Sequence, residues 1–319
     1  MAKTKYKSVW MCNNCGATFP KWEGRCSECG EWNTMVEQRV STSARADRGL
    51  TGTEGARPVA VSDITAGSES RIPMPSRELN RVLGGGLVTG SMVLIGGEPG
   101  IGKSTLVLQN ILAIKSKTVL YVSGEESASQ IKMRADRIGR GSDNVLIVCE
   151  TLLERIMRHV EDINPGILII DSIQTIYSEA LESSAGSVSQ VRECAARLLQ
   201  YAKTTSTPVI LIGHITKEGS LAGPKVLEHI VDAVLQFEGD SKYMYRILRA
   251  IKNRFGSTNE LGIYEMCQRG LREVMDPSQV LMTRGDTSLS GVSIGVTLEG
   301  IRPFLIECQA LVSTAAYGT

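Results

Sequence analysis

One eight-residue segment restricts the fold of this chain more than any other feature. Residues 97–104 read Gly-Glu-Pro-Gly-Ile-Gly-Lys-Ser, which fits the pattern G-x4-G-K-[ST], and they lie between a strand-like run at 91–95 and a helical pattern at 103–114. A strand followed by this pattern and a helix is the context of a P-loop. Its glycines let backbone N–H groups curve around phosphate oxygens, and the helix offers its positive end. The segment therefore predicts a nucleotide site in an α/β domain.

Two elements are expected to complete that site. We expect Lys103 to be exposed and to reach the β- and γ-phosphates of ATP, and Ser104, with Thr105 beside it, to ligate Mg²⁺. The run at 167–171 is an apolar strand that ends in Asp171, the form of a Walker B element, and Asp171 would hold the Mg²⁺ through water. The residues predicted to bind the nucleotide and its metal are Gly97, Glu98, Pro99, Gly100, Ile101, Gly102, Lys103, Ser104, Thr105 and Asp171.

Hydrolysis also needs a group that orients and polarises water. Glu125 and Glu126 follow the strand after the P-loop helix, and parallel strands open toward one edge, where the phosphates bind. Glu125 is our predicted base, with Glu126 second, although exposed loop glutamates are common. His214 follows the strand at 209–212 and has two readings of equal weight, a sensor of the γ-phosphate or a hydrogen-bonded loop histidine.

The rest of the chain has the alternating pattern of an α/β domain. Short apolar runs recur at 118–122, 145–148, 167–170 and 209–212, and helical patterns at 128–138, 152–160 and 188–204 separate them. Such alternation predicts βαβ units and a parallel sheet covered on both faces. Two later segments, 243–251 and 261–266, have the pattern of antiparallel strands around a hairpin.

Four cysteines near the N-terminus predict a separate small unit. Cys12, Cys15, Cys26 and Cys29 form two C-x2-C pairs ten residues apart, each followed by glycine. Four thiolates at this spacing complete a tetrahedral Zn²⁺ site, and so short a segment needs the metal for its fold. Two disulfides or redox chemistry are the weaker alternatives. We therefore place a zinc ribbon at 1–35 and a polar linker at 36–63.

Four aromatic residues surround these cysteines and leave two interpretations open. They are a miniature core, which we favour, or a platform on which nucleic-acid bases stack. The four residues are Trp10, Phe19, Trp22 and Trp32.

A basic segment stands between the two antiparallel strands. Residues 252–257 read Lys-Asn-Arg-Phe-Gly-Ser and present Lys252 and Arg254 beside an aromatic ring. Such a tip suits phosphates, either those of DNA or those of a neighbouring subunit's nucleotide. A solvated charged turn is the alternative.

Composition excludes several classes of protein. With 42% hydrophobic residues the chain can build a core, so wholesale disorder is excluded. Its longest apolar runs are far shorter than the ~18–20 residues that span a membrane. The basic, polar N-terminus has no apolar stretch of a secretory signal, so we expect a cytoplasmic protein. The formal net charge of +1 does not by itself indicate nucleic acid.

Taken together, these motifs resemble the RadA (Sms) family of bacterial DNA-repair proteins, relatives of the RecA recombinase and the DnaB helicase. The similarity runs from about residue 9 to the end. It rests on the cysteine unit with Trp-Glu-Gly-Arg at 22–25, the P-loop, and the segments Leu-Gly-Gly-Gly-Leu at 83–87, Ile-Asp-Ser-Ile-Gln-Thr at 170–175, Gly-His-Ile-Thr-Lys-Glu-Gly at 213–219 and Lys-Asn-Arg-Phe-Gly-Ser at 252–257.

The resemblance implies a RecA-like P-loop ATPase core with a parallel-centred sheet at 64–285, preceded by a small four-cysteine zinc ribbon. It implies a homo-hexameric ring that uses ATP to move along single-stranded DNA and to drive branch migration of recombination intermediates, with the RecA recombinase as partner. It supports nucleotide roles for Lys103 and Ser104. In DnaB-like rings, cations placed like Lys252 and Arg254 reach the nucleotide of the adjacent subunit.

One departure from the family concerns the C-terminal region. The family continues into a Lon-protease-like domain, and residues 286–319 have the pattern of only its two opening strands, so no serine-lysine protease site is predicted. The alternative class is a nucleotide-switched interaction module of the KaiC type, against which the cysteine unit and the basic segment argue. A small-molecule P-loop kinase would need a substrate lid, for which the sequence offers no candidate.

Overall fold

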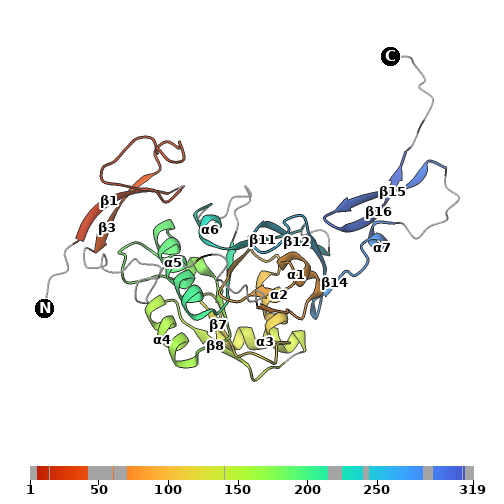
Figure 1. Ribbon diagram of the computed structural model, residues 1–319, viewed down its shortest axis with the longest axis horizontal. Coiled ribbons are helices and arrows are strands. Elements are labelled where there is room, and N and C mark those ends of the chain that lie inside the picture. Colours follow the sequence, from red (N-terminus) through yellow and green to blue (C-terminus); the bar gives the residue numbers. More distant parts are fainter. Residues whose placement is uncertain are drawn as a thin grey trace, which may run out of the picture.

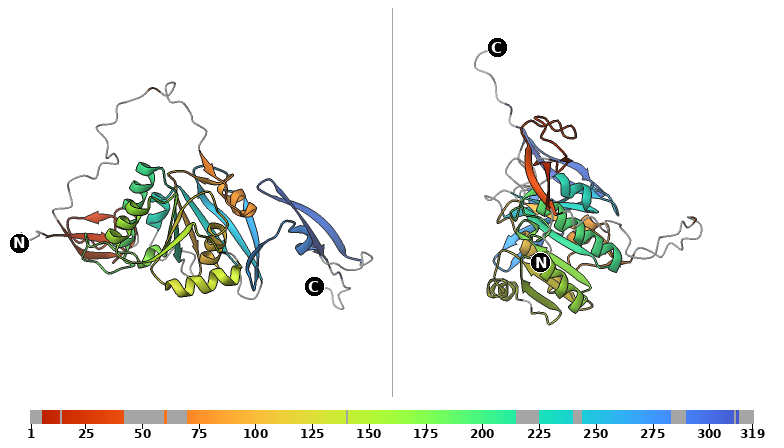
Figure 2. Two further views of the ribbon diagram at one scale, coloured as in Figure 1. Left: turned by 90° about the horizontal axis from the view of Figure 1, so that it is seen from below. Right: turned by 90° about the vertical axis from the view of Figure 1, so that its left-hand side faces the viewer.

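The chain folds into a small N-terminal sheet, a central α/β body and a C-terminal hairpin, which follow one another along the long axis (Figure 1; Figure 2). The computed structural model describes residues 6–13, 15–41, 60, 70–139, 141–214, 225–239, 244–282, 290–310 and 312. Most of the predicted linker lies outside these residues, as do residues 215–219 of the segment at 213–219.

The central body is built on one large sheet. Its nine strands in the described residues follow the order β14-β13-β12-β11-β6-β10-β9-β7-β8. The strands from β11 to β8 in this order are parallel, and β12, β13 and β14 are antiparallel additions at one edge. The strands are β6 (Met92–Gly97), β7 (Val119–Ser123), β8 (Val145–Cys149), β9 (Ile167–Asp171), β10 (Val209–His214), β11 (Ala233–Glu238), β12 (Tyr245–Asn253), β13 (Leu261–Cys267) and β14 (Gly270–Glu273).

Helices cover both faces of the parallel strands. Along β6, Val93 and Ile95 pack into one apolar cluster, whereas Met92 and Leu94 pack into the other. This burial of successive side chains is why the parallel strands are almost continuously apolar. One face carries α1 (Arg77–Leu83), α2 (Lys103–Ile111) and α3 (Ala128–Ile138); the other carries α4 (Leu153–Ile163), α5 (Val188–Thr205) and α6 (Lys225–Ile230). The predicted parallel sheet between two helix layers is therefore confirmed.

Local signals explain where the helices begin and end. Ser127 caps α3, with Gln130 completing a capping box, and Gly139 ends the helix in the left-handed conformation. In α2 the helix ends at Ile111, three residues before the predicted end. Shorter elements complete the body: β4 (Arg71–Ile72), which pairs with β5 (Leu87–Val88), the 3-10 turn η3 (Ile173–Thr175) and α7 (Ser278–Leu281).

The N-terminal sheet has three strands in the described residues, β1 (Tyr6–Cys12), β2 (Thr18–Phe19) and β3 (Met35–Ser41). The strand β3 continues past residue 35, where we expected the linker to begin, because β1 pairs with it along its whole length. The unit contacts the body where Arg192 of α5 donates a hydrogen bond to the carbonyl oxygen of Gly16, 2.6 Å away.

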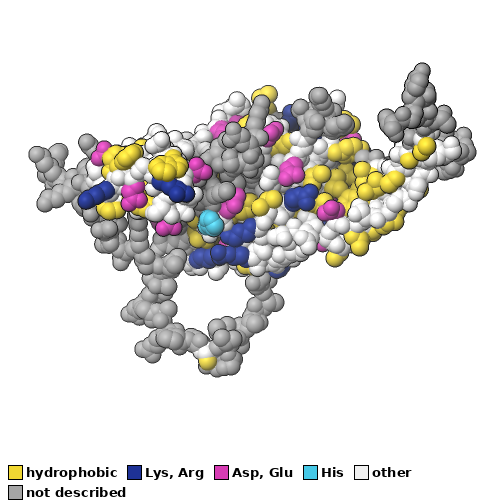
Figure 3. Space-filling view, turned by 90° about the horizontal axis from the view of Figure 1, so that it is seen from above, with side chains coloured by type: hydrophobic (Ala, Val, Ile, Leu, Met, Phe, Trp, Pro, Cys, Tyr) yellow, Lys and Arg dark blue, Asp and Glu magenta, His cyan; other side chains and the backbone are white. Residues whose placement is uncertain are grey.

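The C-terminal hairpin consists of β15 (Val292–Glu299) and β16 (Arg302–Gln309), in agreement with the two strands predicted there. Its side chains at 294, 296, 298 and 301 are hydrophobic and 60–80% exposed. Hydrophobic side chains accordingly gather along the arm at the right of Figure 3. No helix among the described residues is long and apolar enough to span a membrane.

Candidate nucleotide and metal sites

The register of the parallel strands brings the predicted nucleotide residues to one edge of the sheet. Gly97 of β6 lies opposite His214 of β10, and Asp171 of β9 lies opposite Ser123 of β7. The P-loop, Asp171, His214 and the loop that carries Glu125 therefore meet at the carboxyl ends of four strands. This is where open α/β sheets bind ligands.

Two glycines give this edge its backbone shape. Gly102, the N-cap residue of α2, has a φ of +112°, a conformation that other residues rarely adopt. Gly124 packs so closely against η3 that a Cβ atom there would lie 2.0 Å from Thr175 Oγ1. The backbone N–H of Gly124 also donates to the carbonyl oxygen of Asp171, 2.8 Å away. The loop that carries Glu125 is thereby held against the end of β9.

Lys103 is buried, not exposed as the sequence led us to expect. Only 4% of the residue is accessible, because the P-loop backbone wraps around its ammonium group. Lys103 Nζ donates to the carbonyl oxygens of Gly97 and Glu98, both 2.9 Å away. Burial lowers the pKa of Lys103 from 10.5 to about 8, although the charges of Asp171 and Glu125 act in the opposite direction.

His214 lies between Lys103 and Glu125. Its Nδ1 atom is 3.2 Å from Lys103 Nζ, and its Nε2 atom is 3.0 Å from Glu125 Oε1. The ammonium can only donate, so Nδ1 accepts, and Nε2 then carries the proton that is donated to the carboxylate. The ring thus joins the P-loop lysine to the predicted base in one chain of hydrogen bonds.

Glu125 and Glu126 have different surroundings. Glu125 accepts a hydrogen bond from Ser172 and is 40% exposed. Burial acts to raise the pKa of Glu125, but the hydrogen bonds from Ser172 and His214 outweigh it, so this pKa lies below its ordinary value. Glu126 instead forms an ion pair with Arg134 of α3. Of the two, Glu125 is the carboxylate connected to the P-loop.

Asp171 is buried at the end of β9, where Tyr121 donates a hydrogen bond to it. Burial raises the pKa of Asp171, opposed by the hydrogen bonds from Tyr121 and Ser104. The contact between Asp171 and Ser104 brings together a carboxylate and a hydroxyl, which are the oxygen donors that Mg²⁺ prefers. The donor set therefore fits a magnesium ion.

Lys252 and Arg254 lie at the opposite edge of the sheet. Phe237 of β11 pairs with Gly97 at the P-loop edge, whereas Ala233, at the start of β11, pairs with Asn253 of the antiparallel β12. At ~3.3 Å per residue, the length of β6 separates the two edges by about 16 Å. The basic segment thus faces away from the P-loop of its own chain. Lys252 Nζ donates to the carbonyl oxygens of Glu228 and Val231.

The four cysteines converge as their spacing predicts. Their sulfur atoms all lie within 4.8 Å of one another, with Cys12 and Cys29 3.6 Å apart and Cys15 and Cys26 3.5 Å apart. Zn–S bonds of ~2.3 Å require about 3.8 Å between sulfurs in a tetrahedron, whereas a disulfide requires about 2.05 Å. Burial, reinforced by the other thiols, raises the pKa of Cys15 to about 12, so a cation is needed to favour the thiolate. The geometry fits a metal ion.

The aromatic residues around the cysteines divide into two groups. Trp10 and Phe19 pack against the cysteine cluster, as expected for a miniature core. Trp22 and Trp32 are 54% and 66% exposed, and the guanidinium of Arg25 lies 5.8 Å from the ring centre of Trp32. The core interpretation therefore applies to two of the four.

Comparisons with known proteins agree with this geometry. Residues 56–220 match the family described as AAA domain, and residues 10–37 match the rubredoxin metal binding domain. The DNA repair protein RadA of Bacillus subtilis is 49% identical over 324 residues, which cover 100% of this chain and 70% of that protein. This chain belongs to the RadA family. RadA of Pseudomonas aeruginosa is likewise 49% identical, over 98% of this chain and 69% of its own length.

Membership makes the protein a P-loop ATPase of a DNA-repair family with an N-terminal metal-binding ribbon. Among solved structures, a KaiC-like protein of Pyrococcus horikoshii has a TM-score of 0.53 at 23% identity, over 64% of this chain and 99% of that chain. That likeness shows the fold alone. The RecA-like α/β fold expected from the sequence is thereby confirmed.

Three residues that act at these sites were not identified from the sequence. Ser172 and Tyr121 orient Glu125 and Asp171, and Asp232 holds Arg254. A usable signal existed for Tyr121 and Asp232, because each is a polar group inside an otherwise apolar run. Ser172 follows Asp171 directly and carries no such signal.

Proposed function

We propose that this protein is a DNA-dependent ATPase motor that moves along single-stranded DNA and drives branch migration of recombination intermediates. It would act as a ring of six identical subunits in the cytoplasm, with the RecA recombinase as partner. The observation that carries this proposal is the separation of Arg254 from the P-loop of its own chain by the whole length of β6. A cation so placed is useful for catalysis only if another subunit brings its nucleotide there.

In this proposal each residue of the P-loop edge has one task. The backbone N–H groups of residues 97–105 cradle the phosphates, and Lys103 exchanges its carbonyl partners for the β- and γ-phosphate oxygens. Ser104 and Asp171 hold Mg²⁺, which when bound neutralises charge that develops on the phosphate oxygens. Burial of these groups strengthens their electrostatic effect.

Glu125 orients and polarises the attacking water. Its lowered pKa keeps it ionised at neutral pH, so it accepts a hydrogen bond from water throughout the working range. His214 keeps Glu125 in register with Lys103, so that the γ-phosphate and the water are positioned by one connected set of side chains. Phosphoryl transfer depends mainly on such positioning.

Lys252 and Arg254 then supply positive charge to the γ-phosphate bound by the neighbouring subunit. A cation acting in trans is worth ~10³–10⁵ in rate. We also propose that Cys12, Cys15, Cys26 and Cys29 hold one Zn²⁺, and that the chain divides into a ribbon at 1–35, a linker at 36–63, an ATPase domain at 64–285 and a further domain that opens at 286.

The trans role is tested by mixing subunits. Arg254→Ala subunits keep their P-loop, and Lys103→Ala subunits keep their basic segment. Each variant alone should be nearly inactive, whereas the mixture should regain ATPase activity at interfaces that join an intact P-loop to an intact Arg254. If mixed rings assemble without regaining activity, and Arg254→Ala alone keeps its basal ATPase, Arg254 is a DNA contact and the trans role is wrong.

Dependence on DNA is tested separately, by measuring ATPase with and without single-stranded DNA across a salt series. Stimulation that weakens steeply as salt rises is the expected result, because phosphate contacts release counterions. ATPase activity that is indifferent to DNA at every salt concentration would favour a nucleotide-switched interaction module instead.

A further inference from the structure

Asp232 is a buried carboxylate that the nucleotide site does not use. It lies directly before β11, at the edge of the sheet opposite the P-loop, and only 2% of its side chain is exposed. A carboxylate so far from water is stable only when it is paired and hydrogen-bonded. The groups that pair with the Asp232 carboxylate therefore indicate its role.

Two cations and one backbone N–H surround this carboxylate. Asp232 Oδ1 lies 3.2 Å from Arg254 Nη1, whereas Oδ2 lies 2.9 Å from Lys203 Nζ and accepts a hydrogen bond from the N–H of Met92. The backbone N–H of Arg254 donates to the carbonyl oxygen of Asp232, 3.1 Å away. Asp232 thus fixes both the main chain and the side chain of Arg254.

The backbone around Arg254 is also held from the other side, by α1 and the segment that precedes it. Asn253 Nδ2 donates to the carbonyl oxygen of Val82, 3.2 Å away, and Arg71 Nη2 donates to that of Phe255, 2.8 Å away. The Arg254 side chain, by contrast, is 55% exposed. A rigid backbone under a half-exposed guanidinium limits the motion of this segment to the side chain.

We propose that Asp232 is the positioning residue for Arg254: it holds the guanidinium at the subunit surface, from where it passes to the phosphates of a neighbouring subunit's nucleotide. This inference rests on the trans role proposed above. The guanidinium is 55% exposed and a triphosphate carries more negative charge than one carboxylate, so a triphosphate can compete for Arg254. Lys203 assists the exchange because it continues to neutralise Asp232 after Arg254 has left.

A purely structural role makes a different prediction. Asp232 also accepts the N–H of Met92, the first residue of β6, and β6 leads directly into the P-loop. If Asp232 served only to place β6, its loss would damage the P-loop of the same subunit. If it positions Arg254, its loss would damage catalysis at the neighbour's site.

Asp232→Asn separates these roles in the full-length chain, because the amide oxygen can still accept the N–H of Met92 while the charge that holds Arg254 is gone. We expect kcat to fall by about ten- to a hundredfold, the cost of misplacing a catalytic group, while affinity for ATP stays unchanged. Mixed with Lys103→Ala subunits, Asp232→Asn subunits should regain ATPase activity, since their own P-loops are intact. Asp136→Asn, which changes an exposed acid paired with Lys132, is the matched control and should retain full activity.

Three outcomes would contradict the proposal or its foundation. Full activity of Asp232→Asn alone overturns the positioning role. Failure of the Asp232→Asn and Lys103→Ala mixture, when the Arg254→Ala and Lys103→Ala mixture recovers, shows that Asp232 acts within its own subunit and also overturns it. Failure of both mixtures refutes the trans role itself. If Asp232→Asn does not fold, Asp232→Glu takes its place, because it keeps the charge and moves the carboxylate. It is assayed alone and in the same mixtures, and each outcome is interpreted as for Asp232→Asn.

Discussion

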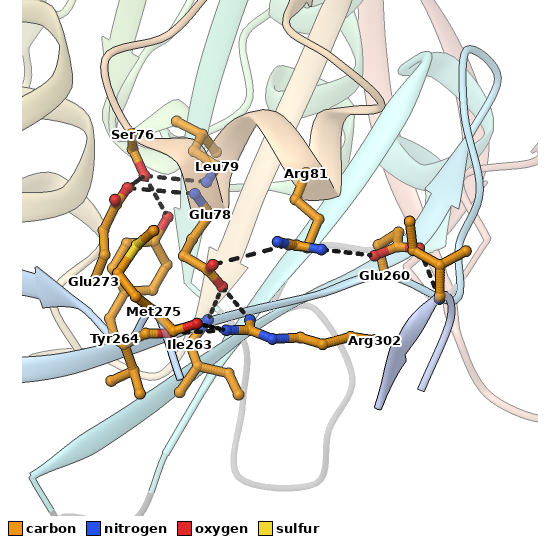
Figure 4. A network of polar contacts seen from close by, with 12 residues as sticks. Ser76, Glu78, Leu79, Arg81, Glu260, Ile263, Tyr264, Glu273, Met275 and Arg302 are labelled. Atoms are coloured by element: carbon orange, nitrogen blue, oxygen red, sulfur yellow. Dashed lines mark hydrogen bonds and ion pairs between the residues drawn. The ribbon is translucent and has the colours of Figure 1, made fainter. Parts of the chain in front are cut away.

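Arg302 of β16 and Glu78 of α1 form an ion pair in which both side chains are almost completely buried, 8% and 1% exposed (Figure 4). Arg302 Nη1 lies 2.7 Å from Glu78 Oε2, and its Nη2 atom donates to the carbonyl oxygens of Val274 and Met275. The same Glu78 oxygen accepts the backbone N–H of Ile263. One arginine therefore fastens the C-terminal hairpin to the ATPase body.

Replacing this arginine tests how much the pair stabilises the chain. Arg302→Met should lower the free energy of unfolding by about 1.5–3 kcal/mol, because it removes the shorter of two cation contacts to the buried Glu78 carboxylate and leaves Arg81 Nε, 3.8 Å from Glu78 Oε1, as the remaining one. Urea unfolding followed by circular dichroism measures the change, since the three tryptophans all lie in the N-terminal ribbon. The double variant Glu78→Gln with Arg302→Met should recover part of the loss, and Lys132→Ala, which breaks a pair with both side chains exposed, should have little effect. Equal losses for Arg302→Met and Lys132→Ala would contradict the prediction.

The cysteine cluster should bind one Zn²⁺ per chain. Removing the ion with a chelator, or replacing Cys26 by Ser, should unfold the N-terminal sheet, because the described core there consists of little beyond these cysteines. Metal analysis of freshly purified protein and circular dichroism provide the measurements. Cys149→Ser, at an exposed cysteine outside the cluster, should keep the full metal content. Far less than one equivalent, with the four thiols paired as disulfides, would refute the assignment.

Lys103→Met should abolish ATP turnover without unfolding the protein. The pKa of Lys103 is lowered mainly by burial, so the folded chain disfavours the ammonium, and a neutral side chain of similar length should leave the melting temperature unchanged or raise it. ATPase assays and thermal unfolding measure the two effects. Lys132→Met, at an exposed lysine of α3, is the control that should keep activity. A folded Lys103→Met variant with near-normal ATPase would contradict the site.

ATP affinity should depend on pH through the same lysine. With a pKa of about 8, the Lys103 side chain loses its proton as pH rises past 8, while a phosphate-bound ammonium must remain charged. Affinity should therefore fall by about tenfold per pH unit above pH 8. By the same linkage, the destabilisation caused by burying this charge is present below pH 8 and disappears between pH 8 and 10.5.

Binding of a fluorescent ATP analogue, measured at several pH values from about 7 to about 9.5, gives the affinity on both sides of the Lys103 pKa. Calorimetry at the upper end, in buffers of different ionisation enthalpy, should show uptake of a proton on binding. Affinity that is constant across the range would mean that Lys103 remains charged before ATP arrives.

Glu125→Gln should separate binding from hydrolysis. The amide keeps the shape of the side chain and cannot polarise water as a carboxylate does, so kcat should fall by about 10²–10⁴ while ATP still binds. Glu126→Gln is the matched control, because Glu126 is engaged with Arg134 and should be dispensable for turnover. Single-turnover assays of both variants measure the rate of hydrolysis separately from ATP binding. A larger loss for Glu126→Gln would reverse the assignment of the base.

The motifs that lie in short segments could be predicted from the sequence. In the P-loop and in each C-x2-C pair, the interacting groups are a few residues apart, so local backbone geometry brings them together whatever the rest of the chain does. The position of Asp171 at the end of an apolar run predicted its place at the nucleotide edge for a similar reason. Parallel strands end at a common edge, and the alternating pattern of strands and helices indicated a parallel sheet.

Other relationships depended on strand order and register, which only the tertiary structure decides. His214 lies between Lys103 and Glu125 because β10 is inserted between β6 and β9, an order that does not follow the chain. Arg254 meets Asp232 because the antiparallel pairing of β12 with β11 returns the chain to the start of β11, and Arg302 of the C-terminal hairpin meets Glu78 of α1, 224 residues earlier in the chain. The burial of Lys103 is more local, since the carbonyl oxygens of Gly97 and Glu98 that enclose its ammonium belong to the P-loop segment itself, and His214 of β10 adds a partner from another strand. Contacts between groups far apart in the sequence leave no local sequence pattern, so they can be identified only in the folded structure.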